Sequence, residues 1–148
     1  MNKIRVKEKQ LRYDKAYLGL AENWSKLSYC KRKKVGAIIV KDSIIISDGF
    51  NGTPAGFDNC CENEMGETHW YVLHAEANAI LKVAKSTNNC NGATLYLTHS
   101  PCKDCSKLIL QSGIIRVVFK EKYKDVSGIR FLNDAGVEII HLNSTLDG

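Results

Sequence analysis

The chain has 148 residues, 44% of them hydrophobic and 25% charged, which is typical of one globular domain covering residues 1–148. Collagen-like, low-complexity and disordered classes are excluded by the two prolines, the eleven glycines and the apolar content. No apolar run nears the roughly 18 residues of a membrane span. The charged start MNKIRVKEKQ lacks the apolar h-region of a secretory signal. The net charge of +5 suits an anionic ligand but not a dedicated nucleic-acid binder, so we expect a cytoplasmic protein with no membrane or stable nucleic-acid partner.

The first half of the chain predicts one helix and one hairpin. Apolar residues recur at helical spacing over residues 9–27, and a basic turn follows at residues 31–34. Residues 35–40 and 44–46 are β-branched runs that predict a hairpin. Residues 50–69 form a long polar loop, a feature that in compact domains is usually functional.

The second half alternates between helix and strand. Helices are expected at residues 74–84, 102–113 and 127–135, and strands at residues 93–98, 114–119 and 137–142. Strand–helix–strand connections within one sheet are nearly always right-handed and parallel. The sequence therefore predicts an α/β fold of three layers, in which the last three strands are parallel, the hairpin completes a mixed five-stranded sheet, and helices cover both faces.

Two short motifs carry metal-binding side chains: His74-Ala75-Glu76 and Pro101-Cys102-Lys103-Asp104-Cys105. One imidazole and two thiols suit Zn²⁺, and a helix start favours thiolate over thiol. Three protein ligands leave a fourth position for water, as in catalytic zinc sites. Zinc lowers the pKa of bound water towards about 7. Glu76 would take the proton and return protons to a ring nitrogen and a leaving amine.

This pattern, H-x-E followed by P-C-x-x-C, is the signature of zinc nucleobase deaminases, and the chain resembles that superfamily. It is most similar to the deoxycytidylate (dCMP) deaminase branch over residues 16–142. The likeness lies in the stretches KVGA at 34–37, GFNGTPAG at 49–56, HAEANAI at 74–80 and SPCKDC at 100–105, together with the strand and Tyr123 that follow. The resemblance implies the cytidine deaminase-like α/β/α fold.

The resemblance also implies roles for individual residues. His74, Cys102 and Cys105 would bind the catalytic zinc, Glu76 would shuttle protons, Asn51 would hydrogen-bond the sugar, and Tyr123 would line the nucleotide pocket. The family converts dCMP to dUMP and ammonia, which supplies dUMP for thymidylate synthesis.

Family members are commonly hexamers. Many are activated by dCTP and inhibited by dTTP, and Mg²⁺ would enter only with such a triphosphate. The family usually has Tyr where this chain has Phe50, so the resemblance leaves effector regulation open while leaving the catalytic motif intact.

Several of these residues have simpler interpretations. Asn51 precedes a glycine and could be a turn residue, and Tyr123 could pack on the sheet edge. The two motif cysteines could be half of a structural zinc site or a redox pair, although neither gives Glu76 a role. The basic turn at residues 31–34 could be solvated or could bind a phosphate.

A second, structural zinc is a further hypothesis. Some viral members of the family have one, with cysteines at the positions of Cys30 and Cys60. The other ligands do not transfer, so Cys61 and His69 would have to complete the set. A metal cross-link would hold down the polar loop that carries Asn51.

Two other functions remain open from the residues. A tRNA adenosine deaminase or a free-nucleoside deaminase would use the same zinc motif, but the first needs a broader basic and aromatic surface. A zinc-stabilised binding module without activity would have a closed four-ligand site and no use for Glu76.

Overall fold

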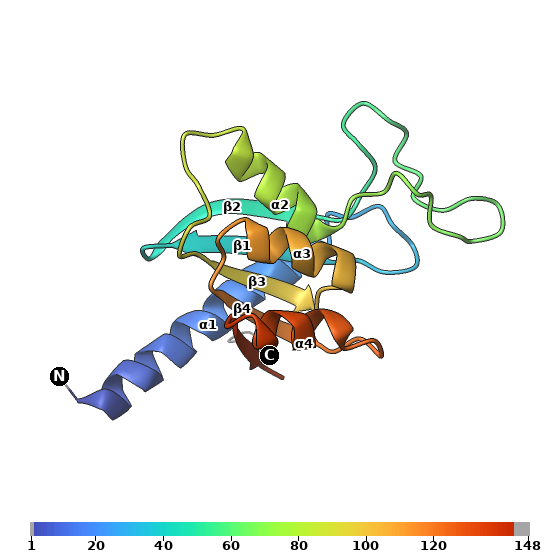
Figure 1. Cartoon of the computed structure of the whole chain (residues 1–148). Helices are drawn as coiled ribbons and strands as arrows, with labels where there is room; N and C mark the ends of the chain where they lie inside the picture. Colours follow the sequence, from blue (N-terminus) through green and yellow to red (C-terminus); the bar gives the residue numbers. More distant parts are fainter. Residues whose placement is uncertain (1, 144–148) are drawn as a thin grey trace.

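A computed structural model describes residues 2–143 (Figure 1). Its centre is one five-stranded sheet in the order β2-β1-β3-β4-β5. The strands are β1 (Gly36–Lys41), β2 (Ile44–Phe50), β3 (Thr94–His99), β4 (Arg116–Glu121) and β5 (Glu138–His141). β3, β4 and β5 are parallel, whereas β1 is antiparallel to both of its neighbours, which confirms the predicted mixed sheet.

The β1–β2 hairpin turns at Asp42 and Ser43, which both have positive φ (51° and 63°). Positive φ at both central residues is what a two-residue hairpin turn of type I′ requires. β2 runs on to Phe50. The sequence predicted an end at residue 46 because the second half of the strand is polar and lacks a strand pattern. Tertiary contacts with helix α2 (Ala75–Ala84) hold this half: the Ser47 hydroxyl donates to the Ala79 carbonyl oxygen, and a Cβ on Gly49 would lie 2.5 Å from the Ala75 oxygen.

Helices cover both faces of the sheet, as predicted (Figure 1). Helix α1 (Lys3–Ser25) packs Leu18 and Ala21 on one face. Helices α2, α3 (Lys103–Gln111) and α4 (Ser127–Asp134) bury their apolar sides on the other. α1 begins six residues before the predicted start because the Asn2 side chain accepts a hydrogen bond from the Ile4 amide and caps it. No helix within residues 2–143 is long and apolar enough to cross a bilayer.

A buried ion pair ties α1 to the sheet. Arg116 donates two hydrogen bonds to Asp14, at 2.8 and 2.6 Å, and the Tyr96 hydroxyl donates a third at 2.6 Å. Burial alone would raise the pKa of Asp14, but the hydrogen bonds from Arg116 and Tyr96 outweigh it and hold that pKa below its ordinary value. The ionised pair therefore persists at neutral pH.

We expect Asp14→Asn to lower the free energy of unfolding by about 3 kcal/mol, because it leaves the Arg116 charge without its buried partner. Urea unfolding measures the loss. The matched control is Lys82→Gln, which removes the partner of Asp48 in a much more exposed pair and should change stability by less than about 1 kcal/mol. Equal losses in the two variants would contradict the buried-pair argument.

Candidate active site

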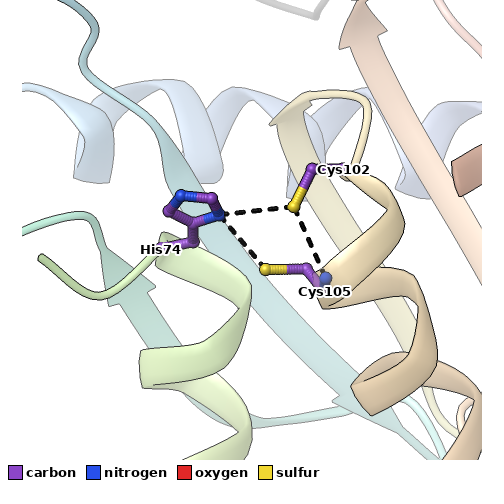
Figure 2. A group of neighbouring side chains, drawn as sticks. All are labelled: His74, Cys102 and Cys105. Carbon is purple, nitrogen blue, oxygen red and sulfur yellow. Dashed lines mark hydrogen bonds between the residues drawn. The ribbon is translucent and has the colours of Figure 1, made fainter. Parts of the chain in front are cut away.

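Two helix N-termini meet at the carboxyl end of β3 and place the three predicted metal ligands (Figure 2). His74 is the N-cap of α2, in extended backbone, so its ring projects ahead of the first turn. Cys102 is the N-cap of α3, and its Sγ accepts a hydrogen bond from the Cys105 amide at 3.4 Å. Each motif therefore starts a helix, which explains why short spacings in the sequence converge in space.

The ligand atoms of His74, Cys102 and Cys105 lie within 4.8 Å of one another. His74 Nδ1 is 3.2 Å from the Cys105 Sγ and 3.6 Å from the Cys102 Sγ. Hydrogen bonds from Cys105 and His74 lower the pKa of Cys102 to about 4, and the bond to Cys102 raises the pKa of Cys105. One imidazole nitrogen and two sulfurs, one readily ionised, fit a zinc ion with one position left open.

Glu76 lies in the first turn of α2 and outside this donor group. It is only 4% exposed, and burial raises its pKa to about 7. A carboxyl group with that pKa exchanges protons readily at neutral pH, which is the property that a general base and acid needs.

Glu76 faces a pocket of about 250 Å³ that is also lined by the candidate metal ligands His74 and Cys102. The other walls come from the turn before β1, the loop after β2, the end of β3 and the segment after β4. These walls include Arg32, Lys33, Asn51, Glu62, Thr68, Val72, His99, Ser100 and Tyr123. The pocket thus brings the candidate metal ligands and a buried carboxyl together with two basic residues.

Asn51 and Tyr123, the two predicted substrate-binding residues, both line this pocket. The Asn51 side chain accepts from the Val35 amide and donates to the Lys33 carbonyl oxygen, each at 2.8 Å. It therefore also holds the basic turn in place. Burial and the neighbouring Glu76 and cysteine groups raise the pKa of Tyr123 to about 12, so its hydroxyl keeps its proton at neutral pH.

Comparison with known proteins decides among the functions that the motifs leave open. The family profile described as "Cytidine and deoxycytidylate deaminase zinc-binding region" matches residues 11–121. The chain belongs to this family. Deoxycytidylate deaminases of Mycobacterium phage D29 and Enterobacteria phage T4 are 40% and 36% identical to it; the alignments cover 74% and 80% of this chain and 95% and 83% of the relatives.

The fold comparison agrees with this family membership. The crystal structure of dCMP deaminase from the cyanophage S-TIM5 in complex with dCMP and dUMP has 46% sequence identity and a TM-score of 0.83. The match covers 96% of this chain and all of that one. The predicted cytidine deaminase-like fold is therefore confirmed.

The four residues predicted for a second zinc do not form one group. Cys30 and Cys61 are joined in a disulfide, and Glu62 is the third potential ligand beside them. Cys60 is exposed, with its Sγ 3.1 Å from the Glu62 carbonyl oxygen, and the His69 ring stacks on Tyr71. Cys60 and Cys61 are adjacent in the sequence, but Cys61 is buried and Cys60 is exposed.

Three further residues line the pocket: Lys33, from the basic turn that could bind a phosphate, and His99 and Glu62, to which the sequence assigned no role. The Lys33 ammonium lies 3.6 Å from the centre of the Tyr123 ring, and His99 packs against the same ring at 5.8 Å between centroids. Burial and the Lys33 charge lower the pKa of His99, which keeps it neutral. Glu62 reaches the pocket because its carboxylate accepts from the Lys31 and Arg32 amides, a long-range contact that leaves no local sequence pattern.

Proposed function

We propose that this chain hydrolyses dCMP to dUMP and ammonia, with zinc held by His74, Cys102 and Cys105 and with Glu76 as the proton shuttle. The single observation that carries the proposal is the three-donor group with a buried carboxyl of raised pKa beside it and outside it. The likeness to a deaminase whose structure holds dCMP and dUMP supports the choice of substrate.

The lining residues divide into those that act on the base and those that bind the rest of the nucleotide. A zinc ion supplies Lewis-acid activation of water. Glu76 accepts a proton from the attacking water and delivers protons to the ring nitrogen and then to the leaving amine, so that dCMP and water give dUMP and ammonia. Burial at the N-terminus of α2 keeps the Glu76 carboxyl dry enough to hold a proton near neutral pH. We further propose that Asn51 and Tyr123 hold the sugar and line the base.

The 5′-phosphate would bind beside the two basic residues of the pocket. Arg32 and Lys33 line it, and Asn51 fixes the turn that carries them. Charge-assisted hydrogen bonds to a phosphate are the strong kind. A nucleoside lacks the phosphate group that would accept these hydrogen bonds.

We therefore expect kcat/KM for dCMP to exceed that for deoxycytidine by about 10–100-fold, the equivalent of one or two charged hydrogen bonds. Lys33→Gln should lose most of that preference, mainly because kcat/KM for dCMP falls. Lys31→Gln is the matched control, since Lys31 is exposed in the same turn and does not line the pocket. Equal kcat/KM for dCMP and deoxycytidine in the unchanged protein would contradict phosphate recognition.

The proposed function is tested by incubating the purified protein, with zinc supplied, with dCMP, CMP, deoxycytidine and adenosine. Ammonia release should be fastest from dCMP. Release from adenosine alone would favour an adenosine deaminase, and release from none would favour a binding module.

Regulation and assembly are proposals from the family. We propose a hexamer, with dCTP and dTTP binding near the end of β2, where a pocket of about 180 Å³ is lined by Phe50, Gly52 and Pro54. Light scattering measures the assembly. Activity titrations with dCTP or dTTP and Mg²⁺, repeated on Phe50→Tyr, measure the regulation.

The second zinc is proposed for the reduced chain, because a disulfide has no thiolate to offer. In a reducing cytoplasm, which is the location we propose, Cys30 and Cys61 would be free, with Glu62 as a third donor. Metal analysis should then find near two zinc ions per reduced chain and one per oxidised chain. One zinc per chain in both states contradicts the proposal.

A further inference from the structure

The first three turns of α1 extend beyond the sheet (Figure 1). We call residues 3–13 the overhang; all of them are exposed, and Asp14 is the first buried residue of the helix. Ile4 and Leu11 lie seven residues apart on one face of it, whereas Val6 and Tyr13 lie on the opposite face and line a pocket with Asp42 and Ser43 of the β1–β2 turn. A helix segment this short is marginal in water without tertiary contacts. The exposed Ile4–Leu11 face therefore suits a contact that the chain itself does not provide.

The overhang is also strongly basic. It carries Lys3, Arg5, Lys7, Lys9 and Arg12 and a single acidic residue, Glu8. Within residues 2–143, none of the five basic side chains forms an ion pair. Its partner should therefore be acidic and partly apolar.

The loop between β2 and α2 has this complementary character. We call residues 53–72 the arm. No Lys or Arg occurs between Lys41 and Lys82, and the arm carries Asp58, Glu62, Glu64 and Glu67. It also exposes large apolar side chains: Phe57, Met65 (84% exposed) and Trp70 (94% exposed). Exposed apolar groups beside charged ones are typical of a protein interface.

The overhang and the arm project from opposite ends of the molecule (Figure 1). They cannot meet within one chain. We propose that the overhang of one copy docks on the arm of a second copy, so that basic residues face acidic ones and the apolar side chains of the two segments pack together. Such a head-to-tail contact uses two different surfaces, and it forms a ring when the rotation between copies closes.

The contact adjoins the active-site pocket. Glu62, Thr68 and Val72 belong to the arm and also line the pocket. The arm is tied to the rest of the chain by the Cys30–Cys61 disulfide, by the Glu62 carboxylate and by the Gly52–Leu73 bridge that closes it. A neighbouring copy seated on the arm would therefore lie beside one wall of the pocket. The inference stands on charge and exposure and does not depend on which nucleotide the pocket accepts.

Charge reversal on each surface tests the proposal. Arg5→Glu/Lys7→Glu on the overhang and Glu64→Lys/Glu67→Lys on the arm each place like charges against each other. Sedimentation velocity over a protein concentration series should show that either variant raises the dissociation constant of the assembly at least about tenfold. The chain with all four changes should regain most of the association, because the charges are then opposite again.

Three controls make the result decisive. Lys85→Glu/Arg130→Glu alters net charge as the overhang variant does, at exposed sites elsewhere, and should leave assembly unchanged. Circular dichroism checks that each variant folds. The unchanged protein should also dissociate as salt rises.

The proposal is overturned by any of three results: a monomeric unchanged protein, an assembly insensitive to both reversals, or no recovery in the four-change chain. Binding of a 30-base single-stranded DNA that is lost on overhang reversal, in a chain that remains monomeric, would assign the overhang to nucleic acid instead.

Discussion

Replacing Glu76 with Gln should lower kcat for dCMP by at least about 10²–10⁴-fold, the contribution typical of a positioned proton donor and acceptor. The amide keeps the size of the side chain but cannot take a proton from water. Zinc content should stay at the value of the unchanged protein, because Glu76 lies outside the donor group. Steady-state kinetics and metal analysis on the same preparation measure both effects.

The same substitution should change stability in a pH-dependent way. The folded pKa of about 7 lies above the ordinary value of 4.5, so the folded chain binds this proton more tightly than the unfolded chain. The stabilisation that protonated Glu76 contributes is therefore fully present below pH 4.5 and is lost as the pH rises through 7. In metal-free protein, the change in the free energy of unfolding caused by Glu76→Gln should be about 3 kcal/mol more favourable at pH 8 than at pH 4. Thermal unfolding at the two pH values measures the difference.

Asp134→Asn is the control for both measurements, since it removes an exposed carboxylate at the end of α4 and touches neither the pocket nor the donor group. It should change neither kcat nor the pH dependence of stability. A Glu76→Gln enzyme that works at nearly the original rate would rule out Glu76 as the proton shuttle.

Cys105→Ser should abolish zinc binding and reduce activity to background. Only His74 and Cys102 would remain as soft donors, and a hydroxyl does not replace a thiolate at a zinc site. Cys105 is also buried beside His74 Nδ1, so no other side chain of the group can take its position. Metal binding adds to folding free energy, and we therefore expect a lower melting temperature in zinc-containing buffer as well.

Cys60→Ser is the matched control for this prediction, because it removes an exposed cysteine outside the donor group. It should retain zinc at the catalytic site and full activity. A Cys105→Ser protein that keeps stoichiometric zinc and deaminates dCMP would show that the donor group is wrong.

The sequence by itself determined the parallel direction of the last three strands and the His-x-Glu and Cys-x-x-Cys motifs. Both depend on short-range regularities: strand–helix–strand connections have one handedness, and side chains at a helix start project towards a common point. His74, Glu76, Cys102 and Cys105 could be named without coordinates because each pair lies within one helix start. The end of β2 could not, because its polar second half is held by contacts to α2.

Only the tertiary structure decided how the polar loop after β2 is anchored and what surrounds the basic turn. Cys30 pairs with Cys61 across 31 residues, and Glu62 binds the backbone of the basic turn, which brings Lys33 over Tyr123. None of these contacts follows a helical or strand period, so no local pattern indicates them. They join the long loop to distant parts of the chain, so they form only when that loop folds back on the rest of the domain.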